Sequence, residues 1–87
     1  MIWDISITHQ AKKEMRNLSD SVLKNVNRKI LDLSQNPFPH GAIKLKLGKG
    51  YRIRVSDWRI VYTVDKTELL ITIYRVIHRS KAYKRAQ

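Results

Sequence analysis

The chain has 87 residues and no cysteine, and its 18 Lys and Arg outnumber its 7 Asp and Glu to give a formal net charge of +11. A chain of this length buries about 60 to 65% of the surface that it exposes when unfolded, which argues against a deep enclosed active site, and the lack of cysteine excludes a disulfide framework and a thiolate metal site. No apolar run approaches the roughly 20 residues that span a bilayer, and the first residues lack the features of a signal peptide, so we expect one cytoplasmic domain over residues 1–87 that is not in a membrane.

The N-terminal half predicts one strand and two helices. Residues 2–7 alternate between apolar and polar side chains, as a half-buried strand does. Thr8 can cap a short helix, and Ser19 can start a second one. The second helix should stop where "NPFPHG" introduces Pro37. The apolar faces of the two helices are formed by Ala11, Met15 and Leu18 and by Val22, Val26, Ile30 and Leu33.

The C-terminal half changes to a period of two. The segments "IKLKL", "YRIRV", "WRIVYTV" and "LLITIYRV" predict four successive strands with short connections, followed by the short basic helix or tail "HRSKAYKRAQ". The predicted fold class is therefore α+β, in the order β-α-α-β-β-β-β. We expect the two N-terminal helices to pack on one face of a mostly antiparallel sheet.

The positive charge lies mainly in the C-terminal half. Residues 1–40 carry 6 basic and 4 acidic side chains, whereas residues 41–87 carry 12 basic and 3 acidic ones. Such a field attracts polyanions, and it predicts a steep salt dependence if the partner is nucleic acid. An anionic membrane or an acidic protein would be attracted as well.

The stretch "YRIRVSDWRIVY" predicts a β-hairpin with three arginines on one face. If Ser56 and Asp57 form a tight turn, Arg54 faces Arg59 across the strand pair. Arg52 then projects from the same face. The apolar side chains that cover the other face are Tyr51, Ile53, Val55, Trp58, Ile60 and Tyr62.

Like charges that face each other destabilise a strand pair by a few tenths of a kcal/mol up to about 1 kcal/mol. Because no carboxylate falls on this face of the hairpin, the arrangement indicates an external anion, and guanidinium groups suit phosphate oxygens well. The alternative is a solvated sheet face with scattered arginines.

The last predicted strand continues both faces. Pairing Val64 with Leu69 places Tyr74 beside Arg59, where it offers a stacking platform for unpaired RNA bases. The alternative is a tyrosine that only covers the aliphatic stems of its neighbours. Arg75 is expected on the buried side, capping the edge of the core or pairing with a helix carboxylate.

Three residues after this strand are further candidates. His78 adjoins the predicted cluster, and its ordinary pKa near 6.5 suits proton transfer at neutral pH. Arg79 would be a fourth anion contact, and Tyr83 could stack on a base or donate its hydroxyl. The alternative is a frayed basic helix without a site.

These residues carry a resemblance. The order "YRIRVSDWRIVY" and "LLITIYRVIHRSKAY", after a helix pair that ends in "NPFPHGAIKLKL", resembles the RelE family of toxin ribonucleases from type II toxin–antitoxin modules. The resemblance covers nearly the whole chain, and its most specific parts are the basic hairpin positions, the "WRIVY" strand and the terminal "HRSKAY".

The resemblance implies a metal-independent endoribonuclease that needs no cofactor and cuts messenger RNA in the A site of the ribosome. Attack of the 2′-hydroxyl on the adjacent phosphate would leave a 2′,3′-cyclic phosphate and a 5′-hydroxyl. Well-known members carry lysine at the two hairpin positions, whereas arginine there stays charged, so His78 is the candidate for proton transfer and Tyr83 the second choice. The implied catalytic residues are Arg52, Arg54, Arg59, His78, Arg79 and Tyr83.

The resemblance also implies partners. Besides the ribosome and the message, we expect an antitoxin of the RelB kind that is acidic and partly disordered. Two alternatives remain at this point: a non-nuclease toxin of the ParE type that inhibits DNA gyrase, and a non-catalytic RNA-binding module. The residues expected to contact RNA outside the catalytic set are Lys44, Lys46, Lys49, Tyr74, Lys81, Lys84 and Arg85.

Overall fold

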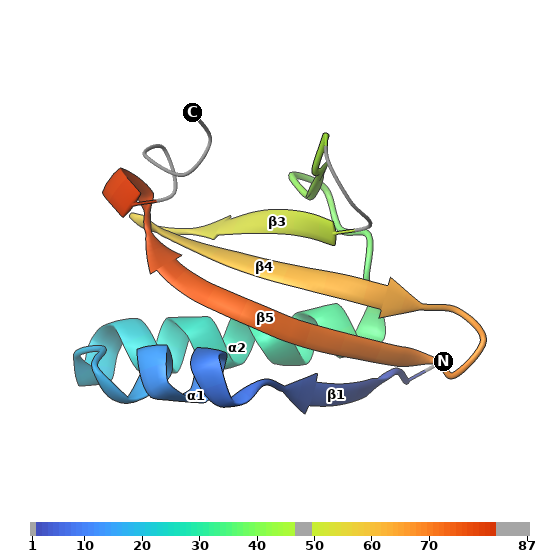
Figure 1. Ribbon diagram of the computed structural model, residues 1–87, viewed down its shortest axis with the longest axis horizontal. Coiled ribbons are helices and arrows are strands. Elements are labelled where there is room, and N and C mark those ends of the chain that lie inside the picture. Colours follow the sequence, from blue (N-terminus) through green and yellow to red (C-terminus); the bar gives the residue numbers. More distant parts are fainter. Residues whose placement is uncertain (1, 47–49, 82–87) are drawn as a thin grey trace.

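The elements follow one another in the predicted order. The computed structural model describes residues 2–46 and 50–81. The predicted α+β fold class is confirmed, with both helices on one face of the sheet (Figure 1). The elements are β1 (Asp4–Ile7), α1 (His9–Arg16), α2 (Asp20–Gln35), β2 (Ile43–Lys44), β3 (Gly50–Val55), β4 (Trp58–Asp65) and β5 (Leu70–His78).

Both helices begin at the predicted caps. The Thr8 hydroxyl accepts a hydrogen bond from the Ala11 N–H at 3.1 Å, and the Ser19 hydroxyl accepts one from the Val22 N–H at 3.4 Å. Each bond satisfies one of the N–H groups that a first helical turn leaves without a partner. Helix α2 ends at Gln35, shortly before Pro37, which cannot continue a helix.

The strands form one sheet in the order β1-β5-β4-β3-β2. Strand β1 runs parallel to β5, and the other neighbours are antiparallel. The predicted strand "IKLKL" is shorter than expected, since β2 has only two residues, which pair with Tyr51 and Arg52. Leu47 lies outside the described residues.

The core fills the space between the helices and the sheet. Its largest fully buried side chain is Tyr62, whose hydroxyl donates a hydrogen bond to the Pro37 carbonyl at 2.8 Å. Burial raises the pKa of Tyr62 to about 12, and the neighbouring Tyr51 adds to this effect. The segment after α2 is thereby attached to the middle of the sheet. The buried apolar side chains are Ala11, Met15, Leu18, Val26, Ile30, Leu33, Ile53, Val55, Ile60, Tyr62, Ile71, Ile73, Val76 and Ile77.

The predicted register of the β3–β4 hairpin is confirmed. Arg54 faces Arg59, and the pairs on either side are also the predicted ones. At the turn Ser56 has a φ of +55°, the sign that the first central residue of a type II′ turn requires. Glycine takes this conformation more readily than serine, so the turn carries local strain.

The predicted register of β4 against β5 is wrong. Val64 pairs with Ile71 instead of Leu69, and a β-bulge shifts the pairing between Val61 and Tyr62. Tyr74 is the extra residue on β5 at this point, because Tyr62 pairs with Ile73 and Val61 with Arg75. Each residue of β5 after the bulge therefore points to the face opposite the one that it would occupy in a regular strand.

The bulge lies where β5 changes neighbours. Strand β1 pairs with β5 only up to Ile73, and α1 lies along the rest of β5. The Glu14 carboxylate of α1 accepts a hydrogen bond from the Val76 N–H at 2.9 Å. It also forms an ion pair with the Arg75 guanidinium at 2.7 Å. The predicted pairing of Arg75 with a helix carboxylate is confirmed, although in the register Arg75 lies opposite Val61 and not on the core side.

These contacts determine the charge of Glu14. Burial by itself would raise the pKa of Glu14, but the hydrogen bonds from Arg75, Val76 and Gln10 outweigh it and lower the pKa below its ordinary value. The carboxylate therefore stays ionised and keeps the edge of β5 saturated.

Neither described helix combines the length and the apolar character that crossing a membrane would require.

Candidate nucleic-acid interface

Three arginines share one face of the β3–β4 hairpin, and we call Arg52, Arg54 and Arg59 the arginine cluster. The alternation along the paired strands places all three opposite the core-facing Ile53 and Ile60. The cluster thus lies on the face of the sheet that the helices do not cover. This part of the sequence-based prediction is confirmed.

The members of the cluster differ in exposure. Arg54 is exposed and Arg52 is intermediate, whereas Arg59 has a relative exposure of only 5%. Arg59 belongs to the central strand β4, and its guanidinium donates a hydrogen bond to the Trp58 carbonyl at 3.4 Å. Arg59 is therefore much less accessible than the other two members of the cluster. Within residues 2–46 and 50–81, no carboxylate forms an ion pair with Arg52 or Arg54.

Arg79 approaches the same end of the sheet. Its backbone N–H donates a hydrogen bond to the Asp57 carbonyl at 2.7 Å, which fixes the residue after β5 to the hairpin turn. Residues 79–81 are helical, and the Arg79 side chain is exposed. The structure brings Arg79 close to the tip of the hairpin that carries the cluster.

His78 does not lie where the sequence-based interpretation placed it. It pairs with Trp58, and its ring meets the Trp58 ring edge to face at 5.3 Å, so it shares the face of Trp58 and not that of the cluster. The bulge explains this, because an uninterrupted strand would have put His78 on the same face as Tyr74. His78 Nδ1 instead contacts the Ser80 hydroxyl at 3.1 Å.

Of the other described candidates, Tyr74 differs from expectation. Ile77, not Tyr74, lies opposite Arg59, although Tyr74 is exposed by 45% and remains accessible. Lys44 pairs with Tyr51 and so shares the face of Tyr51, and Lys46 follows β2 as an exposed residue. The prediction that they contact RNA stays a prediction.

The remaining candidates lie outside the described residues. These are Lys49, Tyr83, Lys84 and Arg85.

The described part of the site offers charge for binding an anion. Clustered guanidinium groups can bind the oxygens of a phosphodiester and stabilise the charge that grows on phosphorus during its cleavage. Among residues 2–46 and 50–81, no three His, Asp or Glu side chains are grouped closely enough to hold a metal ion.

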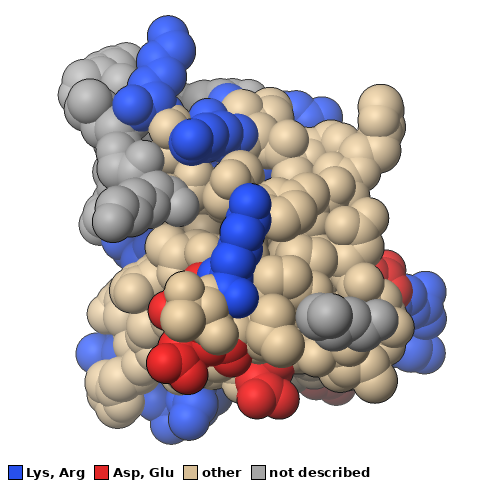
Figure 2. All heavy atoms as spheres, turned by 90° about the vertical axis from the view of Figure 1, so that its right-hand side faces the viewer, with Lys and Arg blue, Asp and Glu red and all other residues tan. Residues whose placement is uncertain are grey.

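Figure 2 shows the molecule from the end of the β4–β5 loop, where Asp and Glu gather on one side and Lys and Arg project around them.

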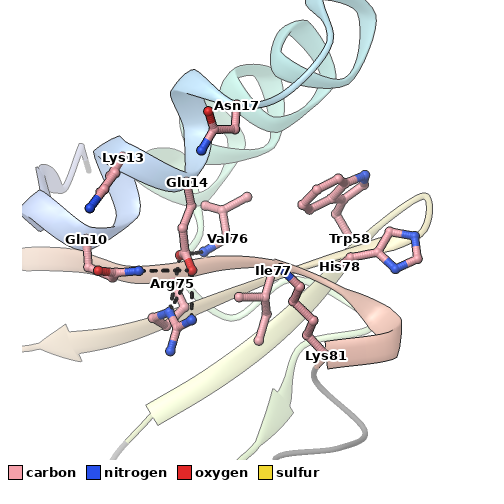
Figure 3. Close-up of a pocket in the computed structure, with 10 residues that line it drawn as sticks. All are labelled: Gln10, Lys13, Glu14, Asn17, Trp58, Arg75, Val76, Ile77, His78 and Lys81. Atoms are coloured by element: carbon pink, nitrogen blue, oxygen red, sulfur yellow. Dashed lines mark hydrogen bonds and ion pairs between the residues drawn. The ribbon is translucent and has the colours of Figure 1, made fainter.

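Sequence reasoning missed a second feature, a cleft at the edge of the sheet along β5. It lies between α1 and the C-terminal end of β5 and has a volume of about 390 Å³ (Figure 3). The hydrophobic pattern assigned Trp58 to the core, but the structure leaves it half-buried at this cleft. One signal was present in the sequence, since the polar residues Gln10, Lys13, Glu14 and Asn17 recur at helical spacing.

Comparison with known proteins identifies relatives along almost the whole chain. The family model described as "ParE toxin of type II toxin-antitoxin system, parDE" matches residues 5–83. A curated protein of Methanocaldococcus jannaschii, described as "Putative toxin RelE1", is 31% identical over 88 residues, which cover 97% of this chain and 98% of that protein.

Solved structures show the same fold. The archaeal RelE–RelB complex from Pyrococcus horikoshii contains a chain that matches with a TM-score of 0.83 and 24% identity, over 93% of this chain and 99% of that one. The toxin–antitoxin complex RelBE2 from Mycobacterium tuberculosis matches with a TM-score of 0.82 and 24% identity, over 91% of this chain and 100% of that one.

Proposed function

The chain belongs to the RelE/ParE superfamily of toxins from type II toxin–antitoxin systems, and from this premise we propose that it is an endoribonuclease that cuts messenger RNA in the ribosomal A site. The observation that carries the proposal is the arginine cluster on the face of the hairpin opposite Ile53 and Ile60. Like charges that face each other across a strand pair repel each other, and a bound anion relieves this repulsion. A phosphodiester of the message supplies that anion.

The proposed reaction is an internal transfer at phosphorus. The 2′-oxygen attacks the adjacent phosphorus, the bond from phosphorus to the 5′-oxygen breaks, and the products are a 2′,3′-cyclic phosphate and a 5′-hydroxyl. The proton of the 2′-hydroxyl leaves, and the 5′-oxygen gains one. The negative charge on the non-bridging oxygens grows in the transition state, and in this proposal Arg52, Arg54 and Arg59 stabilise it. No metal ion or cofactor takes part in this scheme.

Proton transfer needs a different assignment from the one that the sequence suggested. His78 lies on the Trp58 side of the sheet, so it does not face the cluster. We assign proton transfer to Tyr83 or to groups of the ribosome, and the cluster to charge stabilisation. On this proposal cleavage is slow without ribosomes and fast with them.

We further propose that an acidic antitoxin of the RelB kind binds this cytoplasmic toxin and covers its basic surface. The net charge of +11 favours such a partner. Two structural relatives are toxins in complexes with RelB proteins, which supports the proposal. Co-expression with the product of the neighbouring gene is expected to yield a stable complex, and recovery of two separate proteins would contradict it.

Mapping of RNA ends tests the nuclease proposal. Primer extension on a translated message, soon after induction of the toxin, is expected to show cuts in phase with the codons and none in untranslated regions. A blocked ribosome can itself stop reverse transcriptase, so the 5′-hydroxyl is checked by ligation after phosphorylation. Translational arrest without cut ends would favour a non-catalytic RNA-binding module.

The family model that matches is that of ParE toxins, which makes gyrase inhibition the second candidate function. A supercoiling assay with purified gyrase separates the two functions. Inhibition at stoichiometric toxin, without RNA cuts, would replace the nuclease proposal.

A further inference from the structure

We propose that the cleft between α1 and the end of β5, at the edge of the sheet, binds one unpaired RNA nucleotide. The choice of RNA as the ligand rests on the proposed function. The volume of about 390 Å³ falls within the range of small-ligand sites. The cleft is lined by Gln10, Lys13, Glu14, Asn17, Trp58, Arg75, Val76, Ile77, His78 and Lys81.

The helix side of the cleft is polar. Gln10, Lys13 and Asn17 are exposed, and their spacing of three and four residues puts them on one face of α1 (Figure 3). Side-chain amides donate and accept hydrogen bonds, as the edge of a base requires. These side chains do not belong to the hydrophobic core, so packing does not account for their grouping.

The sheet side of the cleft is aromatic. The Trp58 and His78 rings lie at right angles, with their centroids 5.3 Å apart. The Ser80 N–H donates a hydrogen bond to His78 Nδ1 at 3.3 Å, and this contact orients the imidazole ring. An aromatic side chain held in a fixed position is the usual stacking partner of an unpaired base.

The charge of the cleft favours a phosphate. Arg75 and Glu14 neutralise each other as an ion pair at 2.7 Å, which leaves Lys13 and Lys81 as the excess cations of the lining. The same ion pair fixes the floor of the cleft before a ligand arrives, and this reduces the entropic cost of binding.

The cleft and the cluster meet at the end of the sheet. Arg59 of the cluster pairs with Ile77, and Ile77 lines the cleft, so the cleft adjoins the cluster at this end of β5. An RNA strand that passes around this end can place a phosphodiester at the cluster and a nearby nucleotide in the cleft.

Fluorescence of Trp58 tests the proposal. Trp3→Phe leaves Trp58 as the only tryptophan, because the chain has two. Titration with each of the four ribonucleoside monophosphates at low salt is expected to change the Trp58 emission in a saturable way, with Kd near 1 mM. Inorganic phosphate alone is expected to leave the emission unchanged. If Trp3→Phe does not fold, ¹⁹F NMR of the unmutated chain labelled with 5-fluorotryptophan gives the same readout.

Lys13→Ala is expected to weaken nucleotide binding at least three-fold, since Lys13 provides an excess cation. Lys24→Ala on α2 is the matched control and is expected to leave Kd unchanged, because Lys24 lies outside the lining of the cleft. Absence of a saturable change, or equal effects of the two substitutions, would overturn the proposal. So would stronger competition by poly-glutamate than by single-stranded RNA of equal charge, which would indicate a protein ligand.

These experiments distinguish a failure of the nuclease proposal from a failure of the proposed nucleotide site in the cleft. Arg54→Ala is expected to lose cleavage but to keep nucleotide binding. Binding without cleavage in the unmutated chain would overturn the proposed function alone, and cleavage without binding would overturn the cleft alone.

The source of the nucleotide is tested on the ribosome. A crosslink from 4-thiouridine in the message to the α1 peptide would assign the message. Protection of ribosomal RNA by the unmutated chain, but not by Lys13→Ala, would assign ribosomal RNA. If neither is seen, the proposal is wrong for the ribosome-bound toxin.

Discussion

Arg54 and Arg59 face each other but lie in different environments. Arg54 is exposed on β3, whereas Arg59 is 5% exposed on the central strand β4. A buried guanidinium is held by its neighbours, while an exposed one keeps its rotamer freedom until a ligand binds. We infer that Arg59 is a fixed cation around which Arg52 and Arg54 adjust to the phosphate.

Loss of Arg54 is expected to reduce the rate of cleavage more than the stability. Arg54→Ala removes a cation from the transition state and should lower kcat by about 10²-fold to 10³-fold. Arg54→Lys keeps the charge but loses the fork geometry, so its kcat should lie between that of Arg54→Ala and that of the unmutated chain. Single-turnover cleavage on programmed ribosomes measures the effect. The control is Arg28→Ala on α2, and equal loss in both variants would show that only net charge matters.

The hydroxyl of Tyr62 is expected to contribute to stability. Tyr62→Phe leaves the buried Pro37 carbonyl without its 2.8 Å hydrogen bond and should lower the free energy of unfolding by about 1 to 3 kcal/mol. Urea denaturation measures this. Tyr74→Phe serves as the control, because Tyr74 is 45% exposed and its hydroxyl can bond to water. Equal stability of both variants would show that the Tyr62 hydroxyl contributes nothing.

At the scale of elements, α1 takes the place of a strand at the edge of the sheet. Strand β1 saturates β5 as far as Ile73, and Glu14 of α1 saturates the Val76 N–H beyond it. The carboxylate thus acts as a side-chain cap for a strand edge, in the position where a bulge has interrupted the ladder. The helix and the bulge together set the direction in which His78 and Arg79 leave the sheet.

The contacts of Glu14 predict a loss of stability in acid. The folded-state pKa of Glu14 is lowered from 4.5, so its contribution is present above pH 4.5 and is lost as the pH falls through the folded-state value. Glu14→Gln should cost about 1 to 3 kcal/mol at pH 7 and make the free energy of unfolding less dependent on pH below 4.5.

Urea denaturation between pH 2.5 and 7 checks this expectation. The control is Glu68→Gln, which changes an exposed carboxylate in the β4–β5 loop. Parallel pH profiles for the unmutated chain and Glu14→Gln would contradict the role of the ion pair.

The hairpin turn is expected to gain stability from a glycine. Ser56 has a φ of +55°, so Ser56→Gly relieves backbone strain, while the gain in unfolded-state entropy partly offsets it. The net increase in the free energy of unfolding should be at most about 1 kcal/mol. Asp57→Gly has no positive φ to relieve and should be destabilising. Thermal unfolding of both variants checks this expectation. If Asp57→Gly were more stable than Ser56→Gly, the inference of backbone strain at Ser56 would be wrong.

At the scale of the whole molecule, charge and fold are separate properties. The net charge of +11 contributes nothing to packing, yet it accelerates the capture of a polyanion. The core lies under one face of the sheet, which leaves the other face for the arginine cluster.

Binding of single-stranded RNA is therefore expected to depend steeply on salt. The logarithm of the binding constant should fall linearly with the logarithm of the salt concentration, and each phosphate contact should contribute about 0.7 to the slope. Arg52→Ala and Arg54→Ala should each reduce the slope by about that amount, whereas Leu31→Ala, a neutral and exposed control, should not. Fluorescence anisotropy at four salt concentrations measures the slopes, and an unchanged slope in the arginine variants would contradict their contact with phosphate.

The arginine cluster was predictable from the sequence, but the position of His78 was not. Alternation and the Ser56–Asp57 turn specify one register for β3 and β4, because a slip of one residue would turn an apolar face to water. The β4–β5 pairing contains a bulge at Tyr74, for which the local sequence has no glycine or other signal. The same limit applies to the cleft, since its two walls lie far apart in the sequence.

The sequence by itself determined the fold class, the order of the elements, the helix caps and the face of the arginine cluster, because these depend on neighbours along the chain. Only the tertiary structure decided the bulge, the burial of Arg59 and the face of His78. These depend on which elements meet at the far half of β5, where β1 ends and α1 brings Glu14 to the strand. The contacts of Glu14 with Arg75 and Val76 set that geometry, and they join residues that are 61 and 62 positions apart in the chain. Periodicity within one strand carries no information about such contacts.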